Sequence, residues 1–97
     1  MKVQFNATDV LGLCKRYVYP PCKKVAGYIS IEDRLAGDLG YVGNTTSLLA
    51  LKTNEAFQME APCRFSAMDF ANVETVQDHV FEVCRKLARD GRLVLQS

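Results

Sequence analysis

The last third of the chain constrains the fold most, because the period of its apolar residues changes twice after residue 57. Over residues 57–67 apolar and polar residues alternate strictly, which is typical of a strand with one buried face. Pro62 has no backbone N–H to donate, so this strand is expected at a sheet edge or a bulge. The apolar run at 47–53 predicts a partner strand, joined to it by a turn at residues 54 and 55.

A helical period follows. Apolar residues recur at three- and four-residue steps and predict a helix at 72–90; they are Val73, Val76, Val80, Val83, Cys84, Leu87 and Ala88. Asn72 is expected to cap the start of this helix, and Gly91 to end it in the left-handed conformation. Residues 92–95 then predict a short apolar strand in the centre of a sheet.

The first half of the chain is less regular. Residues 1–5 alternate and predict a strand, and residues 8–17 have helical spacing that stops before two prolines. A strand is expected at 25–31. Ser30 and Asp33 resemble a capping box that opens a short helix at 31–39, followed by a loop.

These elements predict one α+β domain spanning residues 1–97. Its mainly antiparallel sheet is expected to hold about four or five strands, covered on one face by the helices at 8–17 and 72–90. Without the middle insertion and one strand, the order approaches the βαββαβ order of a ferredoxin-like fold. This analogy concerns topology only and carries no function.

Composition narrows the class of protein. A formal net charge of +1 produces no global field that would attract nucleic acid or an anionic membrane. No apolar run approaches the roughly 18 residues that a membrane span needs. The N-terminal residues lack the apolar core of a signal peptide, so a cytoplasmic protein that does not contact membranes is expected.

The cysteines do not form a recognisable metal motif. The chain has no C-x-x-C pair, and its four cysteines are widely spaced: Cys14, Cys22, Cys63 and Cys84. No metal and no cofactor is expected, and disulfides rank behind reduced thiols in a chain without evidence of secretion. Cys22 lies in a proline-containing loop and is expected to be the most exposed thiol.

Catalysis is not expected either. The single histidine, His79, is assigned to the polar face of the 72–90 helix, where a solvated role is favoured over that of a general base. The glycines between residues 37 and 43 lack the lysine and the spacing of a phosphate-binding loop. The sequence therefore predicts a protein that is not an enzyme.

Charge is distributed unevenly along the chain. In residues 1–30 five basic residues against Asp9 give +4, and in residues 31–60 two basic against five acidic residues give −3. A basic cluster brackets two tyrosines and is expected to contact nucleic acid or another anionic partner; it consists of Lys15, Arg16, Lys23 and Lys24. The competing interpretation is that these cations only solubilise and stabilise a helix end.

A protein partner is favoured over nucleic acid, because it requires no missing motif. Three tyrosines in or near predicted loops are expected to anchor it: Tyr19, Tyr28 and Tyr41. The edge strand near Pro62 could also pair with a second copy of the chain. The preferred function is therefore a small binding protein acting through a protein–protein interface. An inhibitor or accessory factor of the kind phages and mobile elements encode fits this description as a general expectation for small chains without motifs. The alternative is a nucleic-acid-binding domain that uses the basic cluster.

Overall fold

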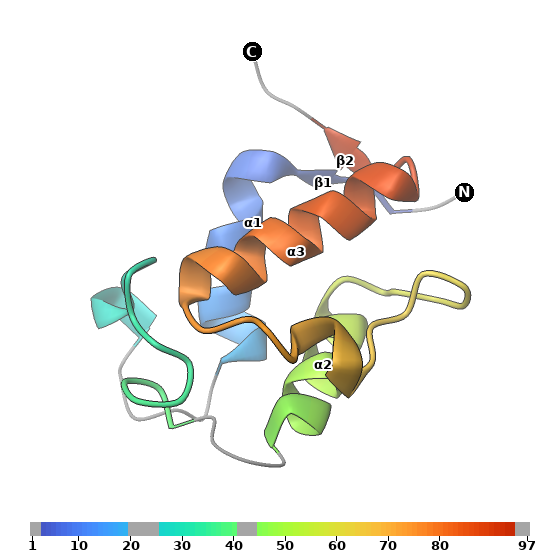
Figure 1. The fold of residues 1–97 in the computed structure, drawn as a ribbon. Helices are drawn as coiled ribbons and strands as arrows, with labels where there is room; N and C mark the ends of the chain where they lie inside the picture. The colour runs from blue at the N-terminus through green and yellow to red at the C-terminus, as the bar shows by residue number, and fades with distance from the viewer. Residues whose placement is uncertain (1–2, 20–25, 41–44, 95–97) are drawn as a thin grey trace.

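The computed structural model describes residues 3–19, 26–40 and 45–94. Figure 1 shows a mainly helical molecule in which α3 crosses the middle. In chain order the elements are β1 (Phe5–Asn6), α1 (Ala7–Leu13), the π-helical η1 (Cys14–Val18), the 3₁₀ turn η2 (Ala26–Tyr28), α2 (Thr45–Ala56), the 3₁₀ turn η3 (Ala67–Phe70), α3 (Val76–Arg89) and β2 (Leu93–Val94).

The predicted antiparallel sheet of four or five strands is wrong. In the described part of the chain, the sheet consists of β1 and β2 alone, which run parallel with Phe5 opposite Leu93 and Asn6 opposite Val94. The two strands lie side by side at one margin of the molecule (Figure 1), so the closing strand is not central in a sheet. The ferredoxin-like topology and the α+β class are therefore replaced by a helical architecture with one terminal strand pair.

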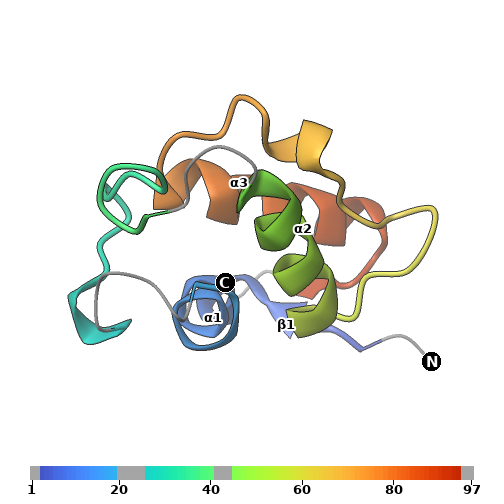
Figure 2. The same ribbon diagram turned by 90° about the horizontal axis from the view of Figure 1, so that it is seen from below.

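The strand predicted at 47–53 belongs to α2. The run that suggested it contains Leu, Ala and Lys, which are strong helix formers, and no Val or Ile. Leu49, Ala50 and Thr53 are buried at helical spacing. α2 packs on η1 and η3. Figure 2 shows α2 above and to the right of α1, which η1 continues. Burial against these turns decides in favour of the helix, because propensity alone leaves a short apolar run ambiguous.

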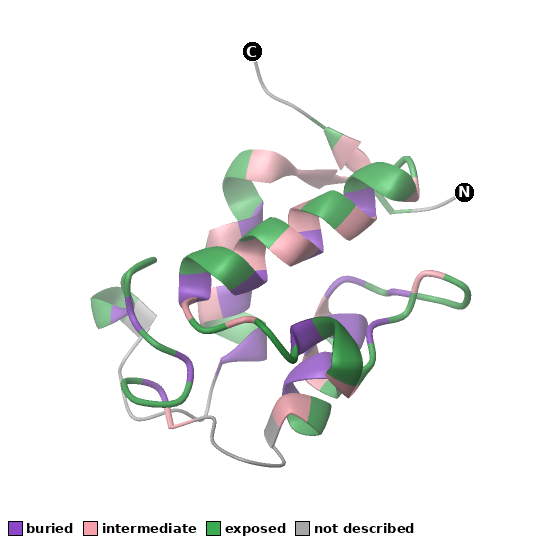
Figure 3. Cartoon of the chain, viewed as in Figure 1, coloured by how far each residue is buried: buried purple, intermediate pink, exposed green. Residues whose placement is uncertain are grey.

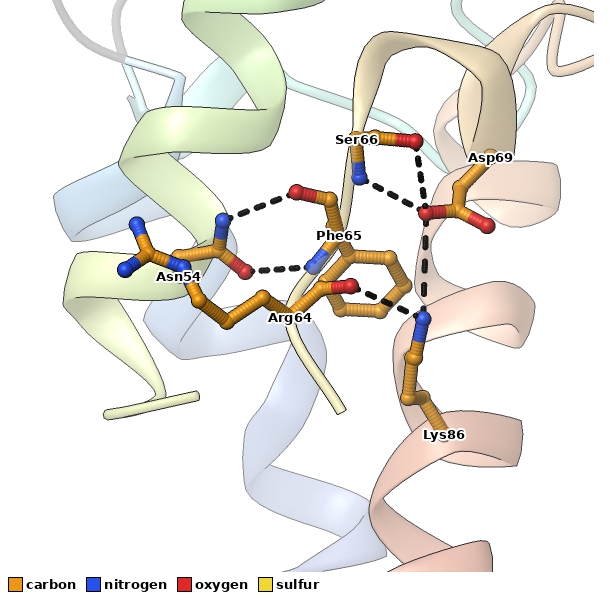
Figure 4. A network of polar contacts seen from close by, with 6 residues as sticks. All are labelled: Asn54, Arg64, Phe65, Ser66, Asp69 and Lys86. Atoms are coloured by element: carbon orange, nitrogen blue, oxygen red, sulfur yellow. Dashed lines mark hydrogen bonds and ion pairs between the residues drawn. The ribbon is translucent and has the colours of Figure 1, made fainter. Parts of the chain in front are cut away.

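Residues 57–67 alternate in burial at several positions but do not form the predicted strand. Phe57, Met59 and Phe65 are buried, while the backbone N–H groups of Met59 and Cys63 bond within turns to Asn54 and Glu60 carbonyls. A side chain replaces the missing neighbour strand (Figure 4). The Asn54 amide donates to the Phe65 carbonyl at 3.0 Å and accepts from the Phe65 N–H at 2.8 Å. The alternation therefore corresponds to an irregular segment in which the Asn54 side chain bonds the backbone N–H and C=O of Phe65.

The other side of this segment is held by α3. The Lys86 ammonium donates to the Arg64 carbonyl at 3.1 Å and lies 3.7 Å from the Asp69 carboxylate. It also lies 4.7 Å from the centroid of the Phe65 ring, in a cation–π contact. Residues 64–66 are thus fixed between α2 and α3.

The predicted helix at 72–90 is confirmed as α3, with a later start. Thr75 rather than Asn72 caps it: the Thr75 hydroxyl accepts from the Asp78 N–H at 3.2 Å, and the Asp78 carboxylate accepts from the Thr75 N–H. The Thr75 and Glu74 N–H groups both donate to the Asp78 carboxylate, and these bonds lower its pKa. Gly91 ends the helix with φ +71°, as predicted.

The N-terminal helix is also confirmed, although it starts at Ala7 and continues as the π-helical η1. The Asn6 side chain caps it by accepting from the Thr8 N–H at 3.1 Å. Of the strand predicted at 25–31, the structure describes residues 26–31, which form η2 followed by turns. The Ser30 N–H does donate to the Asp33 carboxylate at 2.9 Å, but turns rather than a helix follow, and they bury Leu35 and Leu39.

A buried arginine ties the two ends of the described chain together. The Arg92 guanidinium donates to the carbonyls of Val3 (2.7 Å), Gln58 (3.2 Å) and Phe57 (2.5 Å), and lies 3.6 Å from the Asp90 carboxylate. A buried charge is tolerated only with such a complete set of partners. Arg92 thus fastens the strand pair to the segment that follows α2.

Candidate functional site

A polar cluster centred on His79 lies in the interior. The prediction that this histidine lies on the wet face of the helix is wrong: it is fully buried, three residues after Val76 and four before Val83 on the same stripe. Its Nε2 lies 3.0 Å from the Thr53 hydroxyl, and its Nδ1 lies 2.8 Å from the Tyr19 hydroxyl. The histidine therefore joins α3 to α2 and to the end of η1.

The hydrogen-bond pattern determines which ring nitrogen carries the proton. The Thr53 hydroxyl donates to the Leu49 carbonyl at 2.7 Å, and its single hydrogen is thereby used. Nε2 must then donate to the Thr53 oxygen, and Nδ1 accepts from the Tyr19 O–H. Burial lowers the pKa of His79 to about 3, which keeps this ring neutral.

Cys14 adjoins the cluster but does not form a nucleophile with His79. Its sulfur lies 3.9 Å from Nδ1, whose lone pair already accepts from Tyr19. Burial raises the pKa of the Cys14 thiol to about 12, only partly opposed by a hydrogen bond with Tyr19, so the thiolate needed for attack is suppressed. With both residues inaccessible to solvent, the cluster serves packing between helices.

The surface offers a clearer candidate, the outer side of α2. Leu48 and Leu51 are 44% and 47% exposed, although Leu49 on the inner side is buried. Lys52 and Glu55 follow at one-turn spacing from these leucines and share their side of the helix. Figure 3 shows that α2 has both buried and exposed residues. Apolar residues occur among both, whereas a helix with one buried face normally has one apolar stripe.

Tyr17 extends this apolar surface onto η1. Its side chain is 57% exposed and lines a shallow open hollow of about 370 Å³ together with Lys52, Glu55 and Ala56 of α2. The π-helical turn places Tyr17 outward while Cys14 and Val18, on either side, are buried. We call the set Tyr17, Leu48, Leu51, Lys52 and Glu55 the α2 surface.

Another exposed apolar residue differs in its surroundings. Phe81 of α3 is 64% exposed, but the residues one turn before and after it are the exposed polar Gln77 and Arg85. Single apolar side chains on a surface are common and need no partner. Leu48 and Leu51, in contrast, lie one turn apart from each other on the same side of α2.

The nominated residues that the structure describes differ in exposure. Arg16 is exposed with its guanidinium carbon 5.9 Å from the Tyr17 ring centroid, and Lys15 beside it is half-buried. Tyr28 is 79% exposed. Tyr19 is fully buried because its hydroxyl bonds His79, so its expected role as an exposed anchor is wrong. Lys23, Lys24, Tyr41 and Cys22 lie outside the described residues.

The predicted dimer through an edge strand loses its basis, because residues 61–63 around Pro62 form a turn. Among residues 3–19, 26–40 and 45–94, no group of three or more His, Cys, Asp and Glu side chains could share a metal ion. Cys14, Cys63 and Cys84 carry free thiols. In that same part of the chain, every helix is too short or too polar to cross a membrane.

Comparison with protein families, with curated proteins and with solved structures finds no match to this chain. The candidate site therefore depends on the geometry of the described residues.

Sequence reasoning missed the leucines of the α2 surface because it assigned them to a strand. The signal was present: Leu48, Leu51, Lys52 and Glu55 follow helical spacing, as Leu49 and Thr53 do on the other side. Because apolar residues from two sides of one helix follow one another along the chain, they produce a continuous apolar run in the sequence.

Proposed function

We propose that this protein is a non-enzymatic binding module that takes a protein partner on the α2 surface. The observation that supports this most is the pair of exposed leucines on a helix whose inner side is already committed to the core. Covering these leucines would contribute about 25 cal/mol of binding free energy for each Å² of apolar area removed from water. A protein partner gains from this area, and the adjoining hollow beside Tyr17 offers a recess for one of its side chains.

Site-specific crosslinking in the native host tests this proposal. A photoreactive phenylalanine analogue replaces Leu51 in one version of the protein and Phe81 in a matched control. Both positions are exposed and apolar, on different helices. We expect a discrete crosslinked protein from position 51 that is absent from position 81. A photoreactive group at position 17 should capture the same protein, and adding Leu48→Glu and Leu51→Glu to that version should abolish the crosslink. Equal crosslinking from positions 51 and 81 would reject the α2 surface as the interface.

Nucleic-acid contact is a second candidate, supported by one observation. Arg16 and Tyr17 are both exposed, with the guanidinium carbon 5.9 Å from the ring centroid, an arrangement that suits contact with a phosphate and an unpaired base. Backbone binding is strongest at low salt. If labelled single-stranded RNA and duplex DNA fail to bind at low ionic strength, this candidate is excluded. Binding that Lys15→Glu and Arg16→Glu abolish would favour it.

A further inference from the structure

We draw no further inference here: the strongest candidate, the cleft between the turn at residues 34–37, the start of α2 and η3, combines apolar walls with one cation, Arg34, and one carboxylate, Glu74, and nothing in the described residues shows what would occupy it.

Discussion

The helices α3 and α2 use their apolar residues in different ways. In α3 the buried residues Val76, His79, Val83 and Leu87 form one stripe, and the opposite side is mostly polar. In α2 the buried residues occupy one side, and Leu48 and Leu51 occupy the other. Folding accounts for the apolar surface of α3 almost completely. It leaves part of the apolar surface of α2 unexplained, and that remainder is where we place function.

The largest expected effect separates the two sides of α2. Leu49→Ala should destabilise the protein by about 2–5 kcal/mol, because it opens a cavity where a buried side chain packed. Leu48→Ala, one residue away, should change the free energy of unfolding by about 0.5 kcal/mol or less. Urea unfolding of both variants measures the difference. Similar losses of stability in the two variants would show that Leu48 is packed as Leu49 is, and would contradict its assignment to an exposed side of α2.

The next effect concerns how the inner side of α2 is held. Asn54→Ala removes both partners of the Phe65 backbone, and we expect a loss of about 2 kcal/mol because the N–H and C=O are left buried without partners. Asn54→Asp keeps an acceptor for the Phe65 N–H but buries a carboxylate against the Phe65 carbonyl, so its loss at neutral pH should be at least as large. An alanine variant as stable as the wild type would contradict the expected loss, because water would then have to bond the backbone N–H and C=O of Phe65 equally well.

His79 connects the two helices and makes stability depend on pH. Its pKa is about 3 when folded and 6.5 in its ordinary state, so the unfolded chain takes up a proton first as the pH falls. The stabilisation from the neutral ring is thus complete above pH 6.5 and declines below it by about 1.4 kcal/mol per pH unit.

Unfolding at a series of pH values between about 7 and 5 checks this slope. His79→Gln retains a donor for Thr53 and an acceptor for Tyr19 but does not titrate. Carboxylates contribute equally to both proteins, so the difference between their slopes isolates His79. Identical slopes for the two proteins would contradict the assignment of this pH dependence to His79.

The smallest effect refines the start of α3. Thr75→Ala should cost about 1 kcal/mol, the usual value for a lost N-cap. Asn72→Ala, at the residue that sequence patterning selected as the cap, should cost about 0.5 kcal/mol or less, since Asn72 is exposed and lies before the helix. Thermal unfolding of the two variants distinguishes the caps.

Sequence patterning succeeded where one local signal governs one element. The apolar stripe and Gly91 together identified α3 because both features act within the helix itself. It failed where side chains replaced backbone partners. The alternation at 57–67 predicted a ladder, but Asn54 supplies the donor and acceptor that a strand would have supplied. No local pattern contains that contact, because it depends on how α2 packs.

The candidate site was only partly visible for a related reason. Lys15 and Arg16 could be selected from charge alone, and the Arg16 guanidinium carbon lies 5.9 Å from the Tyr17 ring centroid. Tyr19 could not be distinguished from Tyr17, because which of two neighbouring tyrosines faces inward depends on the hydroxyl bond with His79, far away in the sequence. Leu48 and Leu51 required knowledge that α2 is a helix before their exposure could be inferred.

The most direct test of the central claim is the free energy of unfolding of the Leu48→Glu, Leu51→Glu double variant. If these leucines are surplus to the fold, the variant should unfold within about 1 kcal/mol of the wild type, while the crosslink to the partner is lost. A loss of several kcal/mol, comparable to that of Leu49→Ala, would place both leucines in the core and contradict the assignment of the α2 surface to binding.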